Sequence, residues 1–301
     1  MTDKKRLTTA DFDPKVMKLF DQYVHGIIDR RGFLTGAGQM AIGAAAATGL
    51  LAALSPNFAA AQQIKPDDKR LKGEYVEFDS PKGYGKARGY LVRPAKAEGP
   101  LPVVLVVHEN RGLNPHIEDV ARRFALENFI AFAPDALFPL GGYPGDEDSA
   151  RALFGKLDQE KTREDFLAAT VMLATLKGGN GRIGAVGFCY GGGIVNFLAT
   201  KVPGVVAAAP FYGQAPKLED VPNIKAEMLV VNAADDERIN AAWPAYEAAL
   251  KAAKVKYSGF QPAGTQHGFH NDTTPRYHEK AAHEAWELTT ALFERNLREA
   301  G

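Results

Sequence analysis

The sequence contains a single cysteine among its 301 residues, and this scarcity limits what Cys189 can do. A disulfide needs two cysteines, so an intramolecular disulfide is excluded. A thiol-dependent detoxifying or redox enzyme is disfavoured, because no second cysteine is present to resolve an oxidised thiol. Cys189 is therefore a buried apolar side chain, a free thiol or a nucleophile.

An excess of charge of one sign is also missing. Lysine and arginine together number 36, and so do aspartate and glutamate, so the formal net charge is +0. Proteins that bind nucleic acids carry a basic excess or a basic stripe, and we therefore expect no nucleic-acid partner. The 7 histidines include no pair at i, i+4 spacing beside a carboxylate, a common zinc-binding pattern. We accordingly expect neither a catalytic metal nor a cofactor.

The first 61 residues differ in character from the rest of the chain. Two arginines, Arg30 and Arg31, stand before a Gly-Phe-Leu sequence. Residues 36–54 follow as an apolar stretch that is rich in alanine and glycine and carries no charge. Three alanines at 59–61 then provide the small side chains of a cleavage site. Together these features resemble a twin-arginine export signal.

We therefore predict that residues 1–61 form a signal segment and leader, that cleavage falls between Ala61 and Gln62, and that residues 62–301 form the mature domain. The twin-arginine translocation machinery is the expected partner during export, and the mature protein is expected in the periplasm or outside the cell. The alternatives are a membrane anchor and an internal alanine-rich helix. Because the apolar stretch is glycine-interrupted and weakly hydrophobic, we expect no stable membrane insertion after cleavage.

Ahead of the two arginines, apolar side chains recur at the spacing of a helix. This pattern predicts a short amphipathic helix, which either contacts a partner or belongs to a solvated leader. Its apolar positions are Val16, Leu19, Phe20, Tyr23 and Val24.

Beyond the leader, short apolar strands alternate with helical segments. Residues 73–79 and 87–93 alternate apolar and polar side chains, as in a hairpin. Residues 103–107 are apolar throughout, as in a parallel strand that is buried on both faces. The alternation predicts one α/β domain with a mostly parallel, doubly wound sheet flanked by helices. Further strands are expected at 129–133, 183–188, 205–210, 228–233 and 255–260, and helices at 115–128, 162–176, 243–253 and 277–297.

The segment Gly187-Phe188-Cys189-Tyr190-Gly191 lies between a predicted strand and a predicted helix. This is the layout of the nucleophile elbow of an α/β-hydrolase fold, with cysteine at the place of serine. In that fold the acid and then the histidine follow the nucleophile along the chain. Asp235 and Asp236 follow the strand at 228–233, and His267 follows the last strand. Either aspartate could instead only cap the helix that begins near Asn240.

The chemistry that this order predicts is attack by an activated thiol. The imidazole removes the thiol proton, and the carboxylate orients the imidazole and stabilises its cation. Glu109 and Asn110 follow the strand at 103–107, where this fold supplies one oxyanion-hole N–H. We therefore assign the backbone N–H groups of Asn110 and Tyr190 to the oxyanion hole. Glu109 is expected as a buried carboxylate near the thiol, or else in an ion pair with Arg111 or Arg122.

Four segments together resemble the dienelactone hydrolase (carboxymethylenebutenolidase) family, over roughly residues 70–298. The resemblance implies Cys189 as nucleophile, Asp236 as acid and His267 as base. It also implies that Glu109 takes the thiol proton or exchanges partners with the thiol when substrate binds. The segments are Glu109-Asn110-Arg111-Gly112-Leu113-Asn114, Gly187-Phe188-Cys189-Tyr190-Gly191-Gly192, Asp236-Glu237-Arg238-Ile239-Asn240 and Gly264-Thr265-Gln266-His267-Gly268-Phe269.

The activity that this resemblance implies is hydrolysis of an ester or lactone through an acyl-thioester intermediate. Family members bind a substrate carboxylate with an arginine four residues after the histidine, where this chain has Asn271. The expected substrate contacts are Arg111, Tyr143, Phe211 and Arg276. The alternative is a non-catalytic, exported protein that binds a small molecule in the same pocket.

Overall fold

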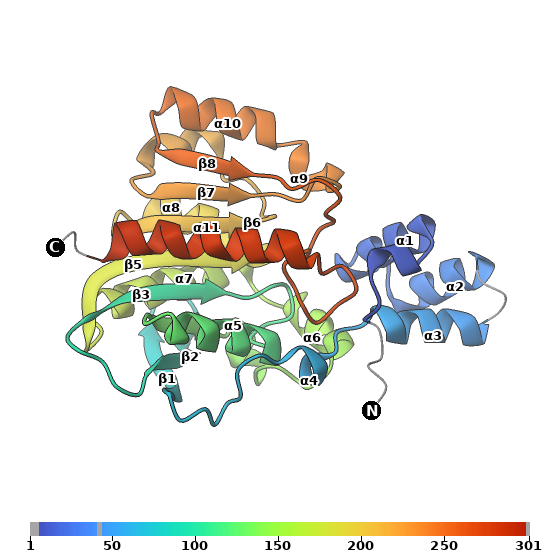
Figure 1. The fold of residues 1–301 in the computed structure, drawn as a ribbon, viewed down its shortest axis with the longest axis horizontal. Helices are drawn as coiled ribbons and strands as arrows, with labels where there is room; N and C mark the ends of the chain where they lie inside the picture. The colour runs from blue at the N-terminus through green and yellow to red at the C-terminus, as the bar shows by residue number, and fades with distance from the viewer. Residues whose placement is uncertain (1–5, 41–43, 299–301) are drawn as a thin grey trace.

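The computed structural model describes residues 6–40 and 44–298, which contain an eight-stranded sheet between two layers of helices (Figure 1). The strand order is β1-β2-β4-β3-β5-β6-β7-β8. An antiparallel hairpin forms one edge and the strands from β4 to β8 are parallel, which confirms the predicted fold class. The strands are β1 (Leu71–Ser80), β2 (Gly85–Pro94), β3 (Leu101–Val107), β4 (Ile130–Pro134), β5 (Gly179–Phe188), β6 (Val205–Phe211), β7 (Glu227–Val231) and β8 (Tyr257–Phe260).

Helices cover both faces of the sheet because its central strands are apolar on both sides. Every residue of β3 and β4 is buried. The helices α5 (Pro115–Leu126) and α11 (Glu279–Leu297) pack on one face. The other face is covered by α7 (Gln159–Ala174), α8 (Tyr190–Lys201) and α10 (Trp243–Ala252). The shorter elements are α6 (Glu147–Phe154), α9 (Glu237–Asn240) and the 3-10 turns η1 (Thr9–Asp11), η2 (Phe138–Leu140) and η3 (Leu218–Asn223).

The N-terminal segment is helical and lies beyond the carboxyl ends of the parallel strands (Figure 1). It contains α1 (Pro14–Val24), α2 (Arg30–Met40), α3 (Ala44–Leu54) and α4 (Phe58–Ala61). The amphipathic helix predicted before the arginines is confirmed as α1, which begins with a proline and a capping aspartate. Its apolar face packs against α2 and α3 in a small core of its own, made by Val16, Met17, Phe20, Tyr23, Phe33, Ala37, Ala47, Leu51 and Leu54.

The apolar stretch at 36–54 is divided between α2 and α3, and its residues 41–43 lie outside the described part of the chain. Within the described residues no single helix is long and apolar enough to cross a membrane. Two consecutive helices that are sharply bent against each other, 30–40 and 45–61, reach the required length and apolarity only when they are counted together.

Candidate active site

Cys189 occupies a strained turn between β5 and α8. Its φ is 55° and its ψ is −113°, a conformation that costs free energy for any residue with a Cβ and is typical of functional turns. The glycines around it are required by close backbone packing. A Cβ on Gly187 would lie 2.3 Å from the Gly191 carbonyl oxygen, and a Cβ on Gly191 would lie 2.3 Å from the Val107 carbonyl oxygen. The predicted elbow is therefore present in the structure.

Asp236 and His267 form a buried pair beside this turn. The Nδ1 atom of His267 is 2.5 Å from Oδ2 of Asp236, and both side chains are about 95% buried. Asp236 also caps the short helix α9 by accepting a hydrogen bond from the backbone N–H of Ile239 at 3.3 Å. Asp235 is exposed. Asp236 therefore has both of the contacts predicted for this acidic pair, because it caps the helix and also contacts His267. Asp236 rather than Asp235 orients the imidazole.

The electrostatics of the site favour an ionised thiol. Burial by itself raises the pKa of Cys189, but the positive charge of His267 and a contact with His25 outweigh it and lower the pKa to about 6. Burial lowers the pKa of His267, but the Cys189 thiolate and the Asp236 carboxylate raise it to about 9. Near neutral pH the pair is therefore a thiolate and an imidazolium. This is the form in which cysteine is a nucleophile.

Glu109 is half-buried at the end of β3, and its partner is an amide. Its Oε2 accepts a hydrogen bond from Nδ2 of Asn271 at 3.1 Å. The alternative ion pair with Arg111 or Arg122 is not found in the described residues, because Arg111 pairs with Glu147 at 3.4 Å and Arg122 pairs within α5. Asn271, which stands at the family's arginine position, thus holds the carboxylate that the sequence places near the thiol.

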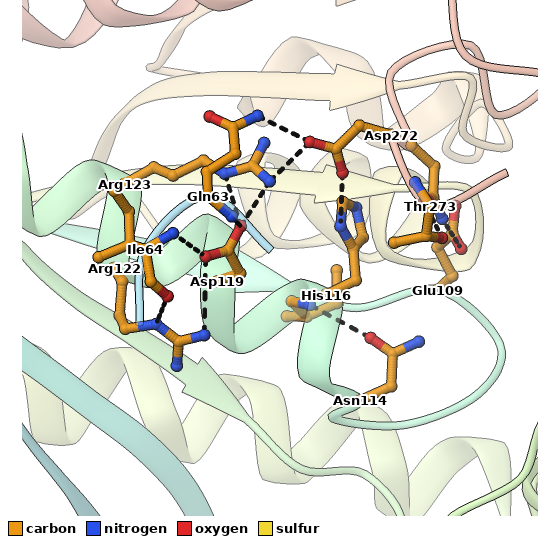
Figure 2. A network of polar contacts seen from close by, with 12 residues as sticks. Gln63, Ile64, Glu109, Asn114, His116, Asp119, Arg122, Arg123, Asp272 and Thr273 are labelled. Atoms are coloured by element: carbon orange, nitrogen blue, oxygen red, sulfur yellow. Dashed lines mark hydrogen bonds and ion pairs between the residues drawn. The ribbon is translucent and has the colours of Figure 1, made fainter. Parts of the chain in front are cut away.

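A buried polar network supports the loop that carries His267 and Asn271 (Figure 2). Asp272 accepts a hydrogen bond from Arg123 at 2.7 Å, another from Gln63 at 2.7 Å, and lies 3.3 Å from Nδ1 of His116. Burial by itself raises the pKa of Asp272, but His116 and the other donors lower it below the ordinary value of 3.8. The loop is therefore tied to α5 through a charged aspartate.

The two residues assigned to the oxyanion hole each line a cavity together with Cys189. Tyr190 is the first residue of α8, where backbone N–H groups have no partner inside the helix. Asn110 follows β3, and its side chain donates from Nδ2 to the carbonyl oxygen of Val24 at 3.0 Å. Asn110 and Cys189 both line two cavities of about 340 Å³ and about 580 Å³, and Tyr190 lines the larger one.

Three of the four expected substrate contacts line the smaller cavity, namely Arg111, Tyr143 and Arg276. Tyr143 lies between η2 and α6, and its hydroxyl donates to Glu147 at 3.0 Å. Phe211, the fourth, is absent from both cavity walls and lies 1% exposed in the core against Phe188. That expectation is corrected: the side chain belongs to the core, and the residue contributes only its carbonyl oxygen, which accepts from the Cys189 N–H at 3.0 Å.

The N-terminal segment reaches the thiol, which sequence reasoning missed. Nε2 of His25, directly after α1, is 3.9 Å from Sγ of Cys189. The His25 and His267 rings meet edge to face, with centroids 4.5 Å apart. An Nη2 atom of Arg238 lies 3.0 Å from the same Nε2 of His25. A lone histidine after an amphipathic helix is a weak signal, because only long-range packing decides what it contacts.

Backbone carbonyl groups hold this part of the segment in place. The carbonyl oxygen of Val24 accepts from Asn110 and, at 3.1 Å, from Nη2 of Arg111. The carbonyl oxygen of Tyr23 accepts from Arg151, whose guanidinium also lies over the Tyr23 ring. The end of α1 is thus bound by the same Asn110–Arg111 loop that follows β3.

Charged side chains add a second set of contacts between the segment and the domain. Arg30 pairs with Asp148 at 2.7 Å, and the hydroxyl of Tyr23 donates to the same carboxylate. Asp21 lies 3.5 Å from Nη1 of Arg276. Two of these domain residues border the smaller cavity, so the segment forms one of its walls.

Comparison with known proteins places these features in a family. The Dienelactone hydrolase family pattern matches residues 87–297, and a second pattern, described as YqhI-like, matches residues 4–42. A Synechocystis protein named "Putative carboxymethylenebutenolidase" is 32% identical over 228 residues, which cover 70% of this chain and 92% of that protein. An Escherichia coli K12 protein named "Putative hydrolase fragment YghX" is 54% identical over 105 residues, which cover 35% of this chain and 90% of that protein.

A solved structure agrees with the fold. The structure described as a putative dienelactone hydrolase from Klebsiella pneumoniae superposes with a TM-score of 0.65 at 28% identity. The match covers 74% of this chain and 99% of the Klebsiella chain.

Proposed function

Because this chain belongs to the dienelactone hydrolase family and is a hydrolase of ester or lactone bonds, we propose that Cys189, Asp236 and His267 carry out that hydrolysis as a triad. The observation that carries the proposal is the buried Asp236–His267 pair at 2.5 Å next to a thiol whose pKa is lowered to about 6. A strained, glycine-flanked elbow that presents this thiol supports the same assignment.

In the proposed mechanism the Cys189 thiolate attacks the acyl carbonyl carbon, and the carbonyl oxygen becomes an oxyanion. The backbone N–H groups of Asn110 and Tyr190 donate to that oxyanion. The tetrahedral intermediate collapses to a thioester, and the leaving oxygen takes the proton of the His267 imidazolium. A water molecule then gives a proton to neutral His267 and adds to the thioester carbonyl, which releases the acid and restores the thiolate.

Asp236 would act throughout by holding Nδ1 of His267, so that Nε2 faces the thiol and the leaving group. Because Cys189 is already ionised near neutral pH, it has no proton to give to Glu109, and Glu109 is proposed instead to exchange partners with the thiolate once substrate displaces its present contact. That contact is the hydrogen bond from Asn271. Two of the three arginines that line the smaller cavity, Arg111 and Arg276, favour a substrate that carries a carboxylate.

The test compares wild type with Cys189→Ser and Cys189→Ala on p-nitrophenyl acetate and on an enol-lactone. Rapid acid quenching followed by mass spectrometry should trap an acyl group on Cys189 in the wild type. We expect hydrolysis to fall to background in Cys189→Ala. Hydrolysis by that variant at the wild-type rate would refute the triad, and slow, pH-independent alkylation of the thiol would favour the non-catalytic binding protein.

We also propose that the chain is exported to the periplasm, or outside the cell, by the twin-arginine machinery and then cut between Ala61 and Gln62. The motif at Arg30 and Arg31 supports the route. The exposed side chains of Ala59 and Ala60 support access to the cut. Cell fractionation tests this proposal: Arg30→Lys with Arg31→Lys should keep an uncleaved protein in the cytoplasm. Normal export of that double variant would refute it.

A further inference from the structure

Three side chains from distant parts of the chain meet at one point. Their spacing in the sequence matches no metal-binding motif. A ring nitrogen of His25, a ring nitrogen of His267 and Sγ of Cys189 all lie within 4.8 Å of one another. We propose that in the uncleaved chain, before any cut between Ala61 and Gln62, these three residues bind Zn²⁺, and that the bound ion joins the N-terminal segment to the catalytic residues and holds the hydrolase inactive. The inhibitory part of this inference rests on the proposed function, whereas the binding part does not.

The donor set suits this ion. Thiolate and imidazole are the ligands that zinc prefers, and three protein ligands with one open position are an ordinary zinc arrangement. The His267 imidazolium releases its Nε2 proton to solvent when the ion binds, because only the neutral ring can be a ligand. A tetrahedral Zn²⁺ with Zn–S of about 2.3 Å and Zn–N of about 2.0–2.1 Å holds its ligand atoms roughly 3.3–3.6 Å apart. The separation of 3.9 Å between His25 Nε2 and Cys189 Sγ is close to that geometry. In the other two pairs, Cys189–His267 and His25–His267, the side chains need to move about 1 Å closer together to bind the ion.

Both imidazoles are oriented in the way that zinc-binding histidines usually are, with the far ring nitrogen bound to a carboxylate or carbonyl group. Nδ1 of His267 contacts Asp236 at 2.5 Å. Nδ1 of His25 contacts the backbone carbonyl oxygen of Asp21 at 2.8 Å and its carboxylate at 3.3 Å. In each ring Nε2 is thereby left to face the thiol.

A second observation points to a missing ligand. Nε2 of His267 is buried and has no hydrogen-bond partner among the described residues. A buried nitrogen without a partner costs free energy, and a bound metal ion would satisfy it. The sequence pattern did not reveal the site because His25 lies 164 residues from Cys189, far outside the spacing of a local zinc motif.

One charge opposes the ion. The guanidinium of Arg238 lies 3.0 Å from Nε2 of His25 and occupies part of the space that the ion needs. Arg238 is exposed, so its side chain can turn into solvent without leaving a buried charge. The backbone contacts at the end of α1 keep His25 at the site when this arginine leaves.

Zinc binding would have two consequences. The thiolate lone pair that attacks the acyl carbon would be donated to the metal, so Cys189 could not act as a nucleophile. The ion would also clamp the end of α1 over both cavities, because His25 lines each of them. Removal of the ion would free the thiol.

The experiment uses the full chain, made metal-free with a chelator and then titrated with Co²⁺ as a spectroscopic probe and with Zn²⁺ as competitor. We expect one Co²⁺ per chain, with a thiolate-to-cobalt charge-transfer band and the visible absorption of a tetrahedral ion. His25→Ala should weaken Zn²⁺ binding by at least the roughly 10–100-fold that loss of an outer-shell partner costs. His283→Ala, which removes a histidine 70% exposed on α11, is the matched control and should bind like wild type.

Zinc should inhibit ester hydrolysis by the wild type, chelation should restore it, and His25→Ala should need correspondingly more zinc for the same inhibition. Absence of the thiolate band, or equal zinc affinity in wild type and His25→Ala, would overturn the site. Circular dichroism and thermal unfolding confirm that the variants are folded. If Co²⁺ binds through Cys189 but the metal-free protein hydrolyses no ester, the site stands and the proposed function fails. Ester hydrolysis by a protein that binds no metal would refute the site and leave the proposed function intact.

Discussion

The sharpest prediction concerns the pH at which Cys189 reacts with iodoacetamide. With a pKa of about 6, the thiol is about 90% ionised at pH 7, whereas a thiol with the ordinary value of 9.0 is about 1% ionised. This roughly 90-fold advantage is partly offset, because a less basic thiolate is a weaker nucleophile. With a Brønsted slope of about 0.4–0.5, three pKa units cost roughly 15–30-fold in intrinsic rate.

The net gain at neutral pH is therefore only about 3–6-fold, too small to identify an activated cysteine. At pH 5 the ionised fractions are about 9% and about 0.01%, and the net gain becomes roughly 30–60-fold. The informative quantity is the pH of half-maximal rate. If His25 limits the access of iodoacetamide to the thiol, it lowers the alkylation rate by the same factor at every pH. The pH of half-maximal rate is then unchanged.

The assay follows loss of free thiol by mass spectrometry between about pH 5 and about pH 9, where the two pKa values are resolved. We expect a midpoint near pH 6 for the wild type. In His267→Asn the midpoint should move upward, because burial is then no longer opposed by the imidazolium. A wild-type midpoint near the ordinary value, or an unchanged midpoint in His267→Asn, would refute the ion pair.

Three further predictions concern the acid, the elbow and the supporting loop. Asp236→Asn should lower kcat by about 10⁴, the cost of losing the orienting carboxylate in a serine triad, whereas Asp235→Asn should stay near wild type in steady-state kinetics. Gly191→Ala should lower the unfolding free energy by about 1–3 kcal/mol, because its Cβ would lie 2.3 Å from a backbone carbonyl oxygen. Gly204→Ala, with nothing within 4 Å, is its control in thermal unfolding, and equal melting temperatures would contradict the packing argument. The pKa of Asp272 is depressed in the folded protein, so its contribution to stability is complete above the unfolded value near 3.8 and is lost as pH falls below it. Urea unfolding of Asp272→Asn should therefore show a deficit at pH 7 that shrinks below about pH 4, and a deficit independent of pH would count against the charge.

Features set by neighbouring residues were readable from the sequence alone. The glycines around Cys189 predict the elbow because a side chain at Gly187 or Gly191 collides with backbone a few residues or one strand away. The apolar run at 103–107 predicts a strand buried on both faces, and every residue of β3 is buried. The amphipathic helix observed as α1 follows from the helical spacing of its apolar side chains.

Residue type and spacing left the choice between the adjacent Asp235 and Asp236 open, and before the structure only the family resemblance favoured Asp236. Asp235 and Asp236 have the same chemistry, and only the direction of each Cβ at the start of α9 brings Asp236 to His267. The expected contact of Phe211 failed for a similar reason. Successive side chains of a strand point to opposite faces of the sheet, and the ring of Phe211, the last residue of β6, is buried in the core.

Contacts between distant segments were also outside the reach of the sequence. Asn271 binds Glu109 across 162 residues, and His25 meets Cys189 across 164. Such pairs carry no local pattern, since their meeting depends on how separately formed elements pack. The sequence alone determined that a cysteine at a glycine-flanked turn is followed along the chain by an aspartate and then a histidine. The packing of α1 against the Asn110–Arg111 loop decided what lies over that thiol, because only hydrogen bonds between remote segments hold it there.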